Sequence, residues 1–107
     1  MELVELLSIG AEKKASDVHL TVGIPPTYRI DGELVSLPEK NLTQEDTICL
    51  VKQALDETRL KRLMENGEID FSYSIPKVGR FRVNAFMQRG SYAMVLRIIP
   101  LEIPLIG

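Results

Sequence analysis

Arginines are the side chains in this sequence whose type and spacing point most directly to chemistry. Arg80 and Arg82 lie two positions apart in a stretch that alternates polar and apolar residues, and Arg97 lies in a second apolar stretch further along the chain. A guanidinium group can donate two parallel hydrogen bonds, which matches the oxygens of a phosphate or a carboxylate. Whether these groups form one site depends on how the segments that carry them pair.

A two-residue loop at Arg89-Gly90 predicts that pairing. With a loop of this length, one face of the hairpin holds four apolar pairs: Phe81 with Ile98, Val83 with Leu96, Ala85 with Met94, and Met87 with Tyr92. The other face then has Arg82 directly across from Arg97, with Arg80 two residues away along its strand.

The preceding segment is expected to join the same sheet through a loop at Lys77-Val78-Gly79, in which Gly79 supplies a left-handed backbone conformation. In that register Phe71, Tyr73 and Ile75 face Ala85, Val83 and Phe81. Both hairpins agree on which face is buried, and both leave the arginines on the solvent face.

The arginine face has two interpretations. Like charges directly across two strands destabilise a sheet by roughly 0.2 to 1 kcal/mol, and Asp70 and Glu68 are expected to compensate. The face is either a solvated polar surface whose arginine stems cover apolar groups, or a phosphate site where two or three guanidinium groups converge. The residues alone leave both open.

The rest of the chain predicts the elements that must hold this face in place. An opening helix is expected over residues 3–14, followed by a strand over residues 17–22. A hairpin over residues 27–37 turns at Asp31-Gly32. Thr43 with Asp46 forms a capping box for a central helix, and a second short helix runs from Asp56 to Asn66-Gly67. The fold class is therefore α+β, in a single domain over residues 1–107.

Composition excludes several classes of protein. The chain has 13 Lys and Arg against 15 Asp and Glu, a net charge of −2, and 45% apolar residues, which argues against disorder and against nucleic acid as a partner. Its first residues are acidic, and no run of apolar residues is long enough to span a bilayer, so a cytoplasmic location is expected. With one cysteine and one histidine, neither a disulfide nor a zinc site is expected.

Other chemistry is sparse in the sequence. It contains no phosphate-binding loop and no nucleophile motif. His19 is interpreted as a structural histidine with its hydrogen bonds satisfied, and Cys49 as a small buried hydrophobic residue.

Several linked segments resemble one family in order and spacing over nearly the whole chain. They are residues 15–20 (ASDVHL), 23–26 (GIPP), 29–32 (RIDG), 79–86 (GRFRVNAF) and 97–100 (RIIP). These segments resemble the N-terminal domain of the type IV pilus retraction ATPases of the PilT family. The chain is more distantly similar to the pilus extension ATPase PilB and the secretion ATPase GspE.

The resemblance implies a PAS-like domain, an antiparallel sheet with an N-terminal helix and a central helical pair packed on one face. In such proteins a RecA-like ATPase domain follows, six copies form a ring, and ATP binds between the two domains. Matched to the family segments, Arg82 and Arg97 are the residues expected to contact the phosphates, with Arg80 and Arg89 as weaker candidates.

The resemblance also implies partners and an activity for the parent protein. The expected partners are its own ATPase domain, neighbouring subunits of a homohexamer, and the inner-membrane pilus machinery, at which it would be peripheral. The chain alone is not expected to hydrolyse ATP and should bind Mg-ATP weakly or not at all. Two alternatives remain: a stand-alone PAS-like module that binds a ligand or partner, and an interaction domain whose arginine face docks an acidic partner.

Overall fold

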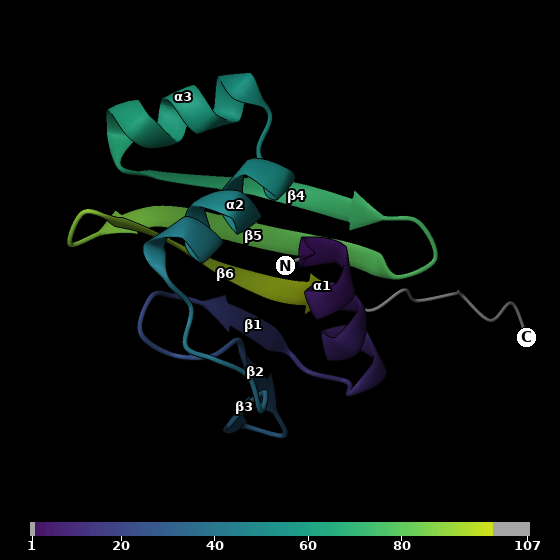
Figure 1. Cartoon of the computed structure of the whole chain (residues 1–107). Coiled ribbons are helices and arrows are strands. Elements are labelled where there is room, and N and C mark those ends of the chain that lie inside the picture. Colours follow the sequence, from purple (N-terminus) through teal and green to yellow (C-terminus); the bar gives the residue numbers. More distant parts are fainter. Residues whose placement is uncertain (1, 100–107) are drawn as a thin grey trace, which may run out of the picture.

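The computed structural model describes residues 2–99 and contains three helices and six strands (Figure 1). The helices are α1 (Leu3–Glu12), α2 (Gln44–Ala54) and α3 (Glu57–Asn66). The strands are β1 (Asp17–Leu20), β2 (Thr27–Ile30), β3 (Glu33–Ser36), β4 (Glu68–Ile75), β5 (Gly79–Gln88) and β6 (Ser91–Ile99). The predicted α+β class is confirmed, and residues 1 and 100–107 of the predicted domain lie outside the described part.

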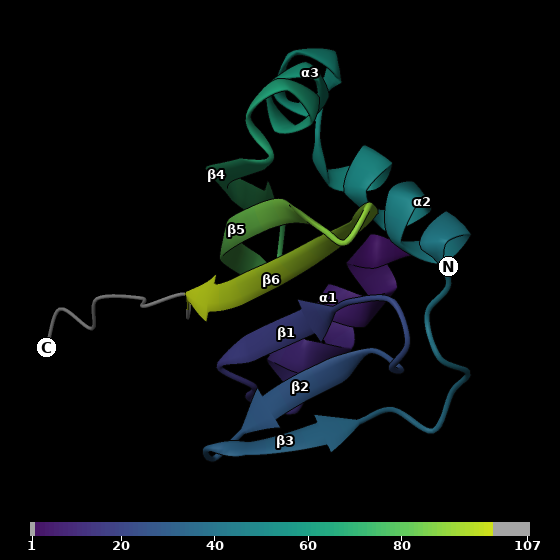
Figure 2. The ribbon, with the colours of Figure 1, turned by 90° about the vertical axis from the view of Figure 1, so that its left-hand side faces the viewer.

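All six strands form one antiparallel sheet in the order β3-β2-β1-β6-β5-β4. Two meanders, β1-β2-β3 and β4-β5-β6, each follow chain order. They meet where β1 pairs with β6, so the first and last strands of the chain lie side by side at the centre of the sheet (Figures 1 and 2). This central pairing brings residues near position 17 next to residues near position 97.

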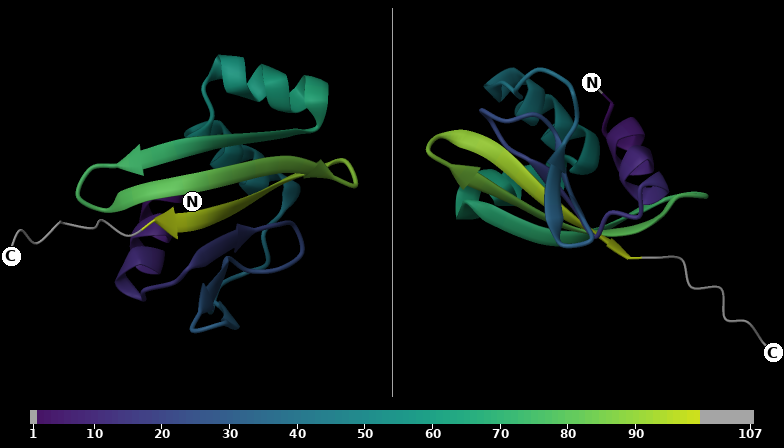
Figure 3. Two further views of the ribbon diagram at one scale, coloured as in Figure 1. Left: turned by 180° about the vertical axis from the view of Figure 1, so that it is seen from behind. Right: turned by 90° about the horizontal axis from the view of Figure 1, so that it is seen from below.

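The helices gather on one side of the sheet (Figure 2). Leu3, Leu6 and Leu7 of α1 are buried, as are Leu50 and Val51 of α2, and they form one core with the inward-facing residues of the central strands. At the β4 end, α3 places the Arg59 guanidinium 4.9 Å from the centre of the Phe71 ring. Seen from behind, the opposite face of the sheet carries no helix of the described chain (Figure 3).

The local signals for turns and caps are confirmed. Asp31 and Gly32 both adopt positive φ angles, 51° and 81°, as a two-residue hairpin loop requires. The capping box of α2 is present in both directions, since Asp46 N donates to the Thr43 hydroxyl and Thr43 N donates to the Asp46 carboxylate. The Asp56 side chain accepts from Arg59 N at the start of α3, and Gly67 ends that helix in the left-handed conformation.

The predicted β5–β6 register is confirmed, but the β4–β5 register is wrong by two residues. Ile75 pairs with Gly79, and Tyr73 with Phe81, so the loop is Pro76-Lys77-Val78. Proline has no N–H for a ladder hydrogen bond, which favours Pro76 in the loop. Lys77 adopts the left-handed helical conformation with φ 69°, whereas Gly79 has a more extended positive φ of 146°. Because a shift of two keeps every side chain on its face, the assignment of the buried face survives this error.

Two further properties concern the described residues alone. None of the three helices combines the length and apolar character that crossing a bilayer would require. Between residues 2 and 99, no three His, Cys, Asp or Glu side chains lie close enough together to hold a metal ion.

Candidate functional site

A row of charged residues crosses the uncovered face of the sheet over four neighbouring strands. Arg29 of β2 pairs with Asp17 of β1, Asp17 pairs with Arg97 of β6, and Arg97 pairs with Arg82 of β5. We call these four residues the arginine row. The predicted juxtaposition of Arg82 and Arg97 is confirmed, and it forms one half of this longer row.

Strand alternation holds these four side chains on the outer face. The residue next to each of them along its strand is fully buried on the helix side: Tyr28, Val18, Leu96 and Val83. Because successive side chains of a strand point to opposite faces, burying these neighbours directs the arginine row outward. A shift of one residue in any of these strands would expose a core side chain, so the core fixes the row.

One carboxylate serves two of the three guanidinium groups. Asp17 Oδ1 lies 3.7 Å from Arg97 Nε, and Asp17 Oδ2 lies 3.8 Å from Arg29 Nε. The Ser16 hydroxyl also donates to Asp17 Oδ2 at 2.9 Å. The Asp17 side chain is 17% exposed, whereas that of Arg97 is 75% exposed, so Asp17 holds the base of Arg97 and leaves most of its guanidinium in solvent.

Arg82 has no such partner. Among residues 2–99, no carboxylate lies within 4.0 Å of its guanidinium, and its side chain is exposed. With three arginines and one aspartate, the arginine row carries a formal charge of 3 − 1 = +2. Its surplus is concentrated at Arg82 and Arg97, next to a shallow hollow of about 240 Å³ lined by Asp17, Arg82, Asn84, Val95 and Arg97. An exposed pair of guanidinium groups beside a hollow is suited to bind a polyanion such as a chain of phosphates.

The prediction that Asp70 and Glu68 balance the arginines is wrong. Asp70 pairs with Asn84, one step further along the sheet, and its Oδ1 accepts a hydrogen bond of 2.9 Å from Asn84 Nδ2. Glu68 lies opposite Phe86. The compensating charge comes from Asp17, because β1 is the other neighbour of β6.

The two weaker candidates lie at different distances from the arginine row. Arg80 is on the same face, two residues from Arg82 and opposite Ile99, so about 7 Å separates the two along the strand. Arg89 lies in the turn beyond β5, seven residues from Arg82, which corresponds to about 23 Å. Arg80 can therefore approach a ligand of Arg82, whereas Arg89 does not join that pair.

Two other sequence interpretations are wrong. His19 lies on the same face as Asp17, and its Nε2 is buried without a hydrogen-bond partner among residues 2–99. Its cross-strand neighbours explain this, since Val95 is apolar and the Thr27 hydroxyl already contacts the Pro25 carbonyl and the Ser36 hydroxyl. Cys49 is exposed, because α2 directs Leu50 and Val51 to the core and leaves Cys49 on its outer side.

Sequence reasoning missed Asp17 and Arg29 as members of the site. Alternation in the segment that became β2 would have placed Arg29 on a solvent face, because its neighbours Tyr28 and Ile30 are apolar. Nothing local indicated that this face continues into that of Arg97, since the connection depends on the pairing of β1 with β6.

Comparison with known proteins agrees with this fold. No family model matches the chain. The type IV pilus retraction ATPase PilT of Pseudomonas aeruginosa is 37% identical over 103 residues, which cover 96% of this chain and 30% of that protein. The type IV pilus ATPase PilU of the same organism is 38% identical over 104 residues, and a twitching motility protein of Neisseria gonorrhoeae is 36% identical over 77 residues.

Solved structures give the same result. The crystal structure of the pilus retraction motor PilT with bound ADP superposes with a TM-score of 0.89 at 46% identity, covering 97% of this chain and 31% of that one. The ATPase DotB of Legionella pneumophila shares the fold, with a TM-score of 0.77 at 24% identity.

The fold and the sequence relatives together define the class: an α+β, PAS-like N-terminal domain of the kind found in pilus ATPases. Within that class, the chain is related to the PilT family of pilus retraction ATPases and corresponds to their N-terminal domain. It spans about 30% of the length of the curated relatives PilT and PilU.

Proposed function

We propose that this chain is the N-terminal domain of a type IV pilus retraction ATPase and that it contributes Arg82 and Arg97 to the phosphates of bound ATP. In this proposal the ATP, with Mg²⁺, is held by a RecA-like motor domain of the full-length protein. The observation that carries the proposal is the pairing of two exposed arginines on the uncovered sheet face, with a surplus of positive charge. The PilT structure with bound ADP supports a nucleotide as the ligand of the full-length protein.

The chemistry required of these arginines is electrostatic. Phosphoryl transfer spreads negative charge over the phosphate oxygens, and guanidinium groups positioned before the reaction stabilise that charge. Strand β6 lies at the centre of the sheet between β1 and β5, and β5 lies between β6 and β4, so Arg82 and Arg97 both project from strands that are paired on each side. Movement of this domain against the motor domain would bring both groups to the nucleotide together, which couples nucleotide state to subunit motion.

The wider assignment follows from the same relatives. The relatives named for pilus retraction and twitching motility support a role in a type IV pilus motor. In this proposal the motor is a homohexamer at the cytoplasmic side of the pilus machinery, and the partners of this domain are its own motor domain and the neighbouring subunits. The alternative of a stand-alone PAS-like ligand-binding module has less support. The helix-facing side of the sheet, where such a ligand would lie, is occupied by fully buried side chains such as Tyr28, Phe81 and Leu96.

The test uses the full-length protein. Arg82→Gln and Arg97→Gln should each lower kcat/KM for ATP by about 10- to 100-fold, since a hydrogen bond to a charged group contributes about 1.5 to 3 kcal/mol. Arg62→Gln on α3, also exposed, is the matched control and should retain wild-type turnover. Wild-type rates in both row variants would refute the phosphate contact.

The isolated chain gives a second measurement. Without a phosphate-binding loop, its affinity for ATP should be millimolar or weaker, because a shallow exposed site gains little that offsets the entropy lost on binding. Calorimetric titration checks this. Micromolar affinity of residues 1–107 for ATP would contradict the proposal that the motor domain holds the nucleotide and this domain only contacts its phosphates.

A further inference from the structure

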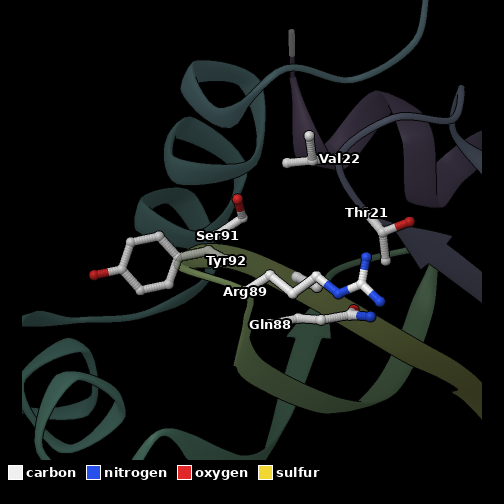
Figure 4. A pocket seen from close by; sticks show the side chains of 7 residues that line it. Thr21, Val22, Gln88, Arg89, Ser91 and Tyr92 are labelled. Carbon is white, nitrogen blue, oxygen red and sulfur yellow. The ribbon is translucent and has the colours of Figure 1, made fainter.

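A second polar hollow lies at the far end of the same sheet face, around the turn between β5 and β6. It has a volume of about 240 Å³, and its polar lining includes Thr21, Gln88, Arg89 and Ser91 (Figure 4). The Arg89 side chain extends across the hollow toward Thr21, with Gln88 alongside, while Ser91 lies on the other side and the Tyr92 ring points away (Figure 4). Segments from both meanders therefore meet here, because β1 ends beside the start of β6.

The polar lining is rich in hydrogen-bond donors. Arg89 is exposed, and no carboxylate within residues 2–99 lies within 4.0 Å of its guanidinium. The Ser91 hydroxyl accepts a hydrogen bond of 3.0 Å from Gln44 Nε2, so its own proton can be donated elsewhere. Thr21 supplies a hydroxyl and Gln88 an amide, and none of the described residues that line the hollow is acidic. One full positive charge with neutral donors around it matches a single oxyanion.

Arg89 lies in a turn whose backbone conformation is unfavourable for arginine. Arg89 has φ 51° and Gly90 φ 78°, so the turn requires a left-handed conformation at both positions, where Asn, Asp or Gly is favoured. Lys14 and Lys77 adopt similar angles, so the conformation alone does not mark a site. At position 89 this conformation coincides with a hollow lined by hydrogen-bond donors. Asn, Asp or Gly would suit the turn better than arginine, but each of them would remove the positive charge from the hollow.

We propose that this hollow, the Arg89 pocket, binds a small oxyanion, a carboxylate or a phosphate, independently of the arginine row. The two places are about 23 Å apart along β5, so one phosphate group cannot contact both. The same chemistry has two sources: a carboxylate side chain of a protein that packs on this face, or a free phosphate or phosphate ester.

Nuclear magnetic resonance titration of the ¹⁵N-labelled chain separates these sources. Sodium phosphate and sodium acetate are added in parallel at constant ionic strength, and the Arg89 side-chain NεH and the backbone amides of Thr21 and Ser91 are followed. We expect saturable shifts at these three groups. Saturation by acetate alone assigns the pocket to a carboxylate, saturation by phosphate alone assigns it to a phosphate, and saturation by both shows that it accepts either oxyanion. No saturable shift with either anion overturns the proposal.

Three variants make the test specific. Arg89→Asn removes the charge but suits the turn, so the chain should fold with an unchanged or higher melting temperature and lose the saturable shifts. Arg89→Lys keeps the positive charge but lacks the two parallel N–H donors of a guanidinium group, so it should weaken binding severalfold. Arg82→Gln, the control in the arginine row, should leave the shifts at the Arg89 pocket unchanged. Shifts that persist in Arg89→Asn would overturn the proposal, whatever the fate of the nucleotide contacts at Arg82 and Arg97.

Discussion

Replacing Asp17 with Asn tests the electrostatics of the arginine row directly. The substitution keeps the size of the side chain and removes the single negative charge that Arg29 and Arg97 share, which raises the formal charge of the row from +2 to +3. Because the neighbouring core residues are untouched, the effect on stability should be mainly electrostatic.

The magnitude follows from the two distances. Unit charges at the observed 3.7 and 3.8 Å attract each other by about 1 kcal/mol each in a dielectric like that of water. Ordering the side chains and screening by salt reduce such partly exposed pairs to about 0.2 to 1 kcal/mol each. Asp17→Asn should therefore lower the free energy of unfolding by about 1 kcal/mol in low salt.

Urea denaturation at about 0.05 M and about 1 M NaCl provides the assay. At 1 M salt the Debye length is about 3 Å, so the loss should shrink to less than half. A double-mutant cycle with Arg97→Gln should show a coupling of about 0.2 to 1 kcal/mol. Asp70→Asn, which removes a carboxylate bonded to Asn84 outside the row, is the control. An equal loss at both salt concentrations would refute the electrostatic account and indicate the Ser16 hydrogen bond or packing instead.

Three further predictions concern the scaffold. Burial raises the pKa of Tyr28 from 10.0 to about 12. The contribution of this shift to the free energy of unfolding is fully present below pH 10, and about 3 kcal/mol is lost as the pH rises to 12. Tyr28→Phe should lack this loss in urea unfolding at alkaline pH. Gly10→Ala should lower the free energy of unfolding by about 1 kcal/mol, because the new Cβ would lie 3.2 to 3.3 Å from three core side chains including Tyr28; a rise in melting temperature would contradict this. Thr43→Ala removes the cap of α2 and should cost about 1 kcal/mol in the same assay, so an unchanged denaturation midpoint would contradict it.

Local chemistry in the sequence was enough to predict much of the fold. The Asp31-Gly32 and Arg89-Gly90 turns, the Thr43–Asp46 capping box and the β5–β6 register all depend on residues close together along the chain. The pairing of Arg82 with Arg97 belongs to this group, because one short loop and one apolar face determine it.

Tertiary structure decided the features that involve distant segments. The pairing of β1 with β6 makes Asp17, rather than Asp70 or Glu68, the partner of Arg97. The same pairing places His19 opposite the apolar Val95, and in the described part of the chain His19 Nε2 has no hydrogen-bond partner. Any antiparallel strand with an apolar inner face could have paired with the free edge of β6. The packing of the whole core therefore determines that β1 is the strand that pairs there. A sequence specifies its turns and faces through local energies, whereas the choice among strands that all satisfy those energies is made only when the helices and the sheet bury their apolar surface together.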